Sequence, residues 1–110
     1  MKKKVIYSAI VDNYDNIKQP NVIKEDYDYI LFSNDINAKN IGIWEIKPIP
    51  YRNIDKTRVA RWVKTHPHIL LNKYEYSVWL DANVVIASDE FYTIIEALYK
   101  QKILISSMAH

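Results

Sequence analysis

Apolar residues run almost without interruption in several segments of the chain, and polar stretches rich in Asp and Asn separate these segments. The first and fourth segments consist of β-branched, aromatic and large aliphatic residues, which is typical of strands buried on both faces. Proline cannot donate a ladder hydrogen bond, so Pro48 and Pro50 place the third strand near a sheet edge or end it. The pattern predicts strands over residues 4–11, 26–33, 44–49, 76–86 and 103–106.

Residues 55–65 repeat their apolar side chains at helical spacing and predict a helix. Asn53 or Asp55 can cap its first turn. The helix should end near His66, because the proline that follows disfavours a helical residue before it, and a short continuation is expected over residues 68–71. The expected buried stripe consists of Val59, Trp62 and Val63.

A second helix is predicted over residues 89–100, with Ser88 as its N-cap. Its expected buried stripe consists of Phe91, Ile94, Ile95 and Leu98. Strands and helices in this order predict an α/β fold with a mainly parallel open sheet and flanking helices. We expect residues 1–110 to form a single domain. Because the last predicted strand has no element after it, we expect a fragment or the N-terminal half of a larger domain, the alternative being a domain that ends at this strand.

Asp81 and Asn83 interrupt the fourth apolar segment, where a carboxylate is costly unless something compensates its charge. In one interpretation the strand ends at Leu80 and residues 81–83 form a turn, since Asp and Asn favour turns. In the other, both side chains project from the strand end into a cleft, because residues two apart on an extended chain point the same way. Their oxygen atoms would then hold Mg²⁺ or Mn²⁺, which prefer such ligands.

Two further polar groups also have a structural and a functional interpretation. Residues 12–16, rich in Asp and Asn, form either a simple turn or a ligand-binding loop at the carboxyl end of the first strand. Arg58, Arg61 and Lys64 form either a solvated helix face or a set of cations that bind phosphates held by a metal at Asp81. A cationic helix and a metal site facing one cleft would suit a nucleoside diphosphate.

Composition and charge exclude several kinds of site. The chain has no cysteine, which excludes disulfides, zinc–thiolate sites and cysteine nucleophiles. Gly42 is the only glycine, which excludes glycine-rich phosphate loops and the glycine-flanked serine nucleophile. A net charge of +2 is too small to indicate nucleic-acid binding. No apolar run approaches the ~18 residues of a membrane span and no signal peptide is recognised, so we expect a cytoplasmic location.

The histidines and Asp81 allow other interpretations. His66 and His68 flank a proline but lack a third nearby ligand, so they do not predict a zinc site. His110 follows the last predicted strand and is either a metal ligand contributed late in the chain or a disordered terminal residue. Asp81 at a strand end would also suit the phosphoacceptor of a small doubly wound signalling domain, although the end of the first strand offers little acidic support.

A set of motifs follows a fixed order along nearly the whole chain. They are Y-S-A-I, N-Y-D, D-Y-I-L-F-S, R-V-A-R, K-T-H-P-H and Y-S-V-W-L-D-A-N, and they begin at residues 7, 13, 28, 58, 64 and 76. In this set the chain resembles the glycosyltransferase-like domain long catalogued as a domain of unknown function, which occurs in bacterial polysaccharide clusters and plant Golgi wall-polysaccharide proteins. That domain is similar to family-eight glycosyltransferases of the GT-A fold.

The resemblance implies a metal-dependent enzyme of the GT-A type that moves a sugar from a nucleotide-sugar, above all a UDP-sugar, to a glycan or polysaccharide acceptor. The alternative is a non-catalytic nucleotide or sugar-nucleotide binding module. Asn83 stands where a second Asp is more usual, and its neutral oxygen should hold a metal less tightly. The implied site consists of Asp81, Arg58 and Arg61 as catalytic residues, Ala9, Asn13, Tyr14, Arg58, Arg61 and Lys64 as donor-binding residues, and Asp81, Asn83 and His110 as ligands of Mn²⁺ or Mg²⁺.

Overall fold

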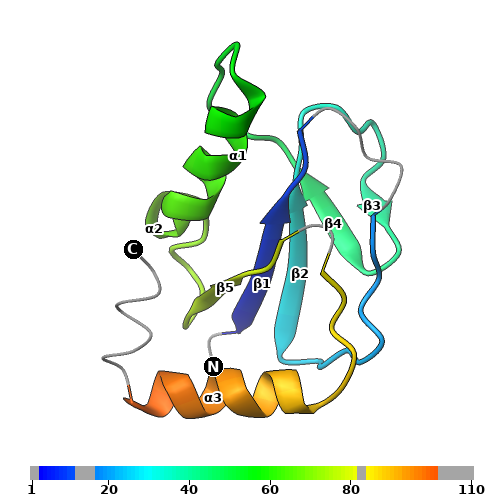
Figure 1. Ribbon diagram of the computed structural model, residues 1–110, viewed down its shortest axis with the longest axis vertical. Helices are drawn as coiled ribbons and strands as arrows, with labels where there is room; N and C mark the ends of the chain where they lie inside the picture. The colour runs from blue at the N-terminus through cyan, green and yellow to red at the C-terminus, as the bar shows by residue number, and fades with distance from the viewer. Residues whose placement is uncertain (1–2, 12–16, 82–83, 102–110) are drawn as a thin grey trace.

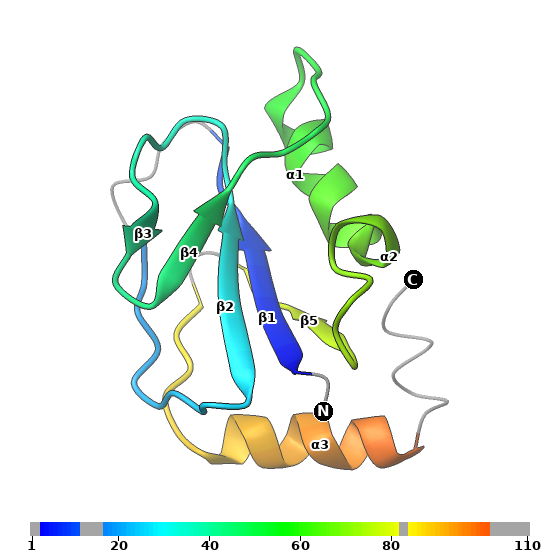
Figure 2. The ribbon, with the colours of Figure 1, turned by 180° about the vertical axis from the view of Figure 1, so that it is seen from behind.

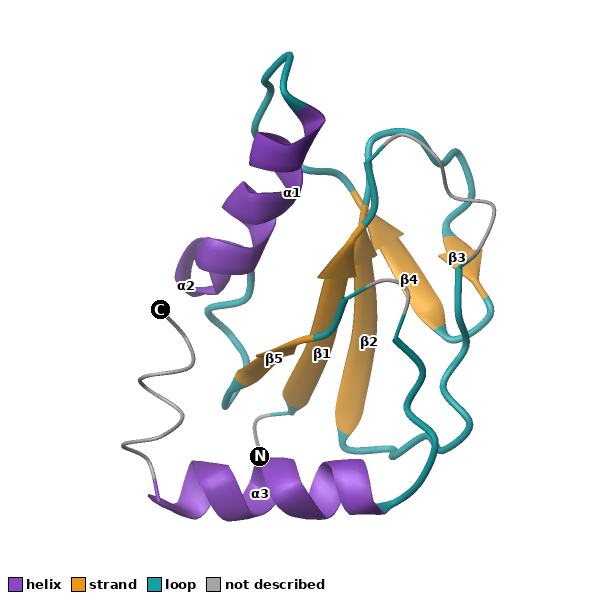
Figure 3. Ribbon diagram, in the orientation of Figure 1, coloured by secondary structure: helices purple, strands orange, loops and turns teal. Residues whose placement is uncertain are grey.

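The computed structural model describes residues 3–11, 17–81 and 84–101, which form one sheet flanked by helices (Figure 1, Figure 3). The strands are β1 (Lys4–Ala9), β2 (Tyr27–Phe32), β3 (Asn40–Ile41), β4 (Trp44–Lys47) and β5 (Ser77–Trp79). The helices are α1 (Lys56–Thr65), α2 (Pro67–Leu70) and α3 (Glu90–Gln101). The strand order in the sheet is β3-β4-β2-β1-β5.

The sheet is mixed but mainly parallel, which confirms the predicted α/β class. β1 runs parallel to both β2 and β5, and β2 runs parallel to β4. β3 runs antiparallel to β4. The more specific GT-A type stays a prediction. The strand predicted over residues 103–106 lies outside the described residues.

The antiparallel pair forms a tight hairpin that the hydrophobic pattern did not predict, because β3 has only two residues. Gly42 occupies the turn with a φ of 60°, a left-handed conformation that glycine adopts without steric penalty. The Gln19 side chain stabilises the turn with two hydrogen bonds to its backbone. Its Nε2 donates to the Ile41 carbonyl at 3.1 Å, and its Oε1 accepts from the Ile43 amide at 3.0 Å.

Two separate cores cover the two faces of the sheet, because side chains alternate along each strand. One face packs against α1 and α2, and the other packs against α3, which crosses near the starts of β1 and β2 (Figure 2). The first core includes Val5, Tyr7, Ile30, Phe32, Val59 and Val63. The second includes Ile6, Tyr27, Tyr29, Leu31, Tyr92 and Ile95.

The order of the strands explains which face each connection covers. From β1 the chain moves outward to β2 and then β4, and Ile17 and Ile36 from these connections pack on the α3 face. From β4 it returns past β1 to β5, and this return runs through α1 on the opposite face. Crossovers between parallel strands are almost always right-handed. A connection that adds the next strand on the other side of β1 must therefore cross the other face of the sheet. The reversal makes the boundary between β1 and β5 the switch point of the sheet.

The strand predicted over residues 76–86 is much shorter than the apolar pattern indicated. β5 covers only Ser77–Trp79, and the Val84 amide donates to the Asp81 carbonyl at 2.9 Å. The prediction of burial on both faces was wrong for Val84 and Val85, which are 44% and 39% exposed. Ile86 is buried, because it packs in the α3-face core rather than in a strand. The strand therefore ends near Leu80, as one interpretation predicted, while the turn predicted over residues 81–83 lies mostly outside the described residues.

Both long helices form where they were predicted, but the buried stripe of α3 differs. Asp55 caps α1, since its Oδ1 accepts from the Thr57 amide at 3.0 Å. In α3 the predicted stripe is confirmed at Ile95, which is buried, but it was wrong at Ile94, which is 52% exposed, because Tyr92 packs against the sheet instead. Within the described residues, no helix has the length and apolar character needed to cross a bilayer.

Candidate functional site

The carboxyl ends of β1 and β5 lie side by side at the switch point of the sheet. The Leu80 amide donates to the Tyr7 carbonyl at 2.9 Å, which holds the chain after β5 against β1. Asp81 follows directly and is exposed. In open α/β sheets, ligands bind in the crevice outside the carboxyl ends of the strands at such a switch point. The topology therefore places Asp81 where this class of fold binds its ligand.

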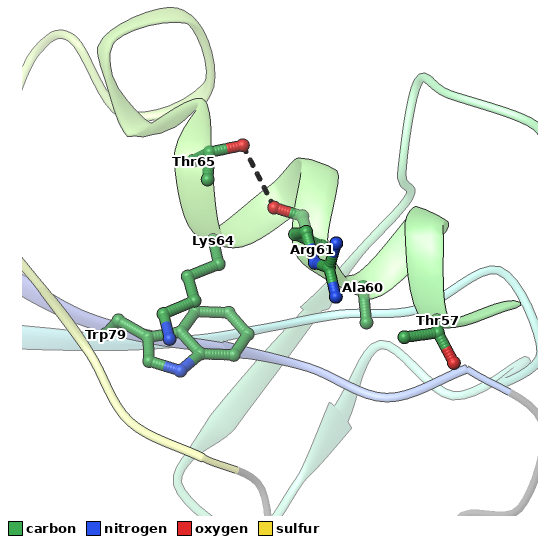
Figure 4. Close-up of a pocket in the computed structure, with 6 residues that line it drawn as sticks. All are labelled: Thr57, Ala60, Arg61, Lys64, Thr65 and Trp79. Carbon is green, nitrogen blue, oxygen red and sulfur yellow. Dashed lines mark hydrogen bonds between the residues drawn. The ribbon is translucent and has the colours of Figure 1, made fainter. Parts of the chain in front are cut away.

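A pocket of about 390 Å³ lies on the α1 side of this edge (Figure 4). It is lined by Thr57, Ala60, Arg61, Lys64, Thr65 and Trp79. The helical residues repeat every three or four positions, so they form one face of α1, while Val59 and Val63 on another face are buried against the sheet. Trp79 comes from β5 and closes the opposite side. Arg61 and Lys64, predicted as part of a cationic face, thus line the same pocket.

Trp79 connects this pocket to Asp81. Its indole Nε1 donates a hydrogen bond to Asp81 Oδ1 at 2.9 Å. The Lys64 ammonium lies over the same ring, 5.9 Å from its centroid, within the range of a cation–π interaction. The Trp79 ring also packs edge-on against the Tyr7 ring, with centroids 5.4 Å apart. Hydrophobic patterning did not single out Trp79, although its position two residues before Asp81 placed both side chains on one side of the chain.

Tyr7 supports the helix end that carries Lys64. Its hydroxyl donates to the Lys64 carbonyl at 2.8 Å, and its side chain is 2% exposed. Burial raises the pKa of Tyr7 well above its usual value, so the phenol keeps its proton at neutral pH. Tyr7 therefore acts here as a hydrogen-bond donor that fixes the position of α1 relative to β1.

Arg58 is placed differently from the other two cations. Its side chain is 69% exposed, and its Nε lies 3.6 Å from the Asp55 carboxylate. It does not line the pocket beside Trp79. The predicted cationic face is therefore divided, with Arg61 and Lys64 at the pocket and Arg58 near the start of α1.

The remaining predicted site residues are only partly described. Ala9 ends β1 and its side chain is buried in the core beneath α1, so it can offer a ligand mainly its backbone. Asn13, Tyr14, Asn83 and His110 lie outside the described residues. Within residues 3–11, 17–81 and 84–101, no three metal-binding side chains cluster together. One exposed carboxylate still suits Mg²⁺ or Mn²⁺ accompanied by a diphosphate, because such ions are often held by one or two carboxylates together with substrate phosphates.

A second pocket, of about 220 Å³, lies at the carboxyl ends of β2 and β4 beside the start of α1. Its lining includes Val11, Asn34, Tyr51 and Arg52. Asn34 is fixed in place by Ile49, since its Nδ2 donates to the Ile49 carbonyl at 3.0 Å and its Oδ1 accepts from the Ile49 amide at 2.8 Å. The first pocket presents cationic, aromatic and hydroxyl groups, whereas this one presents amide, aromatic and cationic groups together with the carboxylate of Asp35.

His66 and His68 belong to a column of stacked rings on α1 and α2. The Trp62 and His66 rings stack with centroids 4.3 Å apart, and His66 and His68 stack at 5.7 Å. His66 Nδ1 lies 2.7 Å from the Trp62 carbonyl, which can only accept, so Nδ1 carries the proton. These contacts show a packing role for the pair at the end of α1.

Comparison with known proteins gives a match to a family model. The family model described as "TOD1/MUCI70, glycosyltransferase-like domain" matches residues 1–110. Neither the curated proteins nor the solved structures include a match to this chain.

Proposed function

The chain belongs to the TOD1/MUCI70 glycosyltransferase-like domain family, and from this premise we propose that it is the donor-binding part of a metal-dependent glycosyltransferase of the GT-A type. The sugar would pass from a nucleotide-sugar, above all a UDP-sugar, to a glycan or polysaccharide acceptor. The observation that carries the proposal is the position of Asp81. It lies at the switch point of the sheet, hydrogen-bonded to Trp79, which lines a pocket with Arg61 and Lys64.

Asp81 would hold Mg²⁺ or Mn²⁺, with Asn83 and His110 as further ligands. When bound, the cation would neutralise the charge that develops on the departing nucleoside diphosphate. The described part of the site supports this assignment, because an exposed carboxylate stands beside a pocket whose charged groups are cations. Such a combination attracts a dication and a polyanion together.

The cations of α1 would bind the donor phosphates. The Arg61 guanidinium can form paired hydrogen bonds with phosphate oxygens, and Lys64 can supply a mobile point charge. Both would stabilise negative charge as the glycosidic bond to the diphosphate breaks, while the sugar carbon passes through an oxocarbenium-like state. Arg58 would bind the donor from the start of α1, after separation from Asp55.

The base and ribose would lie toward the carboxyl end of β1, near Ala9, Asn13 and Tyr14. The second pocket supports this direction, because Val11 belongs to its lining and directly precedes residues 12–16 in the sequence. Its amide and aromatic groups suit a nucleoside better than a diphosphate. The donor would then extend along the carboxyl edge of the sheet.

Calorimetric titration of UDP tests this proposal. We expect binding in the presence of Mn²⁺ and its loss after EDTA is added. Asp81→Ala should abolish the metal-dependent binding and leave the fold intact, because the side chain is exposed. Asp89→Ala is the matched control, since Asp89 is an exposed aspartate that pairs with Lys24 at 2.9 Å away from this pocket. Equal UDP affinity in wild type and Asp81→Ala would remove Asp81 from the proposed role.

A second candidate is a non-catalytic nucleotide or sugar-nucleotide binding module. The composition of the first pocket favours it, because the lining contributed by the described residues includes no carboxylate or histidine that could act as an acid or base. Release of free UDP from UDP-sugars separates the two functions. Binding without release or transfer, in a chain that includes any flanking sequence, would favour the module.

A further inference from the structure

Trp79 makes two contacts of opposite electrostatic character in the candidate site. Its indole N–H donates to Asp81 Oδ1 at 2.9 Å, while the Lys64 ammonium lies over its face, 5.9 Å from the centroid. An aromatic ring is positive at its edge and negative on its face. The edge therefore matches the carboxylate and the face matches the cation. One side chain therefore contacts Asp81 and Lys64, two of the charged groups of the site, at the same time.

These contacts keep the Lys64 ammonium and the Asp81 carboxylate, which would otherwise neutralise each other, from forming an ion pair. An exposed lysine that lines the pocket and an exposed aspartate bonded to another residue of its lining attract each other, and a direct ion pair would occupy the carboxylate oxygens that a metal needs. In the described part of the chain no ion pair joins Lys64 to Asp81. Each instead has Trp79 as its partner, and the carboxylate uses one oxygen for it.

The ring that performs this role is itself held firmly. It is half-buried and packs edge-on against Tyr7, whose hydroxyl donates to the Lys64 carbonyl at 2.8 Å. Tyr7 thus fixes both the ring and the backbone of the lysine that covers it. The position of the indole N–H relative to Asp81 follows from packing in the core rather than from the exposed surface.

We infer that Trp79 is a positioning residue that presents the Asp81 carboxylate to a divalent cation and keeps Lys64 from pairing with it. This inference rests on the proposed function and names a residue that acts through Asp81. When a metal and a diphosphate bind, Asp81 keeps its contact with the indole through one oxygen. Lys64 leaves the ring face and pairs with the phosphates, a stronger partner than the ring.

The first test needs no metal. The protein has three tryptophans and hence three indole N–H resonances, and that of Trp79 is the one missing from Trp79→Phe. In Asp81→Ala, we expect the Trp79 resonance to move upfield and its exchange with water to accelerate. The indole of Trp44 should be unchanged, because it donates to the Lys18 carbonyl at 2.8 Å. An unaltered Trp79 resonance would overturn the inference, whatever the protein binds.

The second test measures Mn²⁺ affinity in four variants. Trp79→Phe keeps a ring against Tyr7 and removes the N–H, and it should weaken Mn²⁺ binding about tenfold, as loss of a ligand's hydrogen-bond partner commonly does. Trp62→Phe, the same change in a stacked ring away from Asp81, should stay within about twofold. Lys64→Met, measured alone as the reference for the double variant, removes the lysine that would compete for Asp81. Added to Trp79→Phe, it should restore most of the lost affinity, because no lysine then competes for Asp81.

The outcomes distinguish the two proposals. Equal Mn²⁺ affinity in wild type and Trp79→Phe, or no recovery in the double variant, would show that Trp79 only packs. A wild-type protein that binds no Mn²⁺ would refute the proposed metal site instead. The indole resonance in Asp81→Ala would still decide whether Trp79 positions the carboxylate.

Discussion

Tyr7→Phe removes one oxygen atom that joins the first strand to the end of α1. The Tyr7 hydroxyl donates to the Lys64 carbonyl at 2.8 Å, in the last turn of the helix, where carbonyls lack intrahelical donors. Neighbouring carbonyls have their own partners, since the His66 ring bonds the Trp62 carbonyl at 2.7 Å. A phenylalanine ring keeps the packing on Trp79 but leaves the Lys64 carbonyl without this donor in a partly buried place.

The expected loss of stability follows from these contacts. A neutral hydrogen bond contributes about 0.5–1.5 kcal/mol, and a buried acceptor left unpaired costs about 1–3 kcal/mol, so we expect a loss of about 1–2 kcal/mol. For a domain of this size that corresponds to roughly 4–8 °C in Tm. Urea unfolding followed by tryptophan fluorescence measures it. Tyr51→Phe is the control, because its hydroxyl accepts only an exposed bond from Asn53, at 3.1 Å. Equal stability of the two variants would refute the role given to Tyr7.

Three further predictions concern the rest of the fold. Burial raises the pKa of Tyr27 and Tyr92 in the folded protein, so these phenols ionise more readily in the unfolded chain. The free energy of unfolding, measured by denaturant titration, should therefore fall as pH rises above about 10. Among the described residues Ser8 Oγ is fully buried without a partner, so Ser8→Ala should be neutral or stabilising by up to about 1 kcal/mol; a clear loss would reveal a partner. Gly42→Ala should destabilise by about 1–2 kcal/mol in thermal unfolding, since its φ is 60° and a Cβ would lie 2.1 Å from Gln19 Oε1; unchanged stability would contradict the strain.

The hydrophobic pattern predicted the α/β class because most segments form, in the folded protein, the helix or strand that their local sequence favours. β1, β2 and α1 formed within a few residues of their predicted ends. The pattern gave a wrong prediction where apolar residues continue past the end of a strand and are exposed. Val84 and Val85 continue the apolar run of β5 but lie beyond the end of this strand and are exposed, and no local sequence signal separates an exposed valine from a buried one.

The same limit applies to the candidate site. Spacing placed Arg61 and Lys64 on one helix face, and both line the first pocket. Spacing could not divide Arg58 from them, because its partner Asp55 acts both as the helix cap and as an ion-pair partner. Trp79 was missed because its role depends on contacts with Tyr7, Lys64 and Asp81, which come from different parts of the chain. These residues come together only when β5 pairs with β1.

The most direct test of the proposed metal and diphosphate site is the location of bound Mn²⁺, measured by paramagnetic broadening of backbone amide resonances in the presence of UDP. The proposal predicts broadening at the carboxyl ends of β1 and β5, strongest around Leu80 and Asp81, and sharp resonances along α3. Broadening that is uniform, or centred on Asp26 and Asp89 on the α3 side, would contradict it.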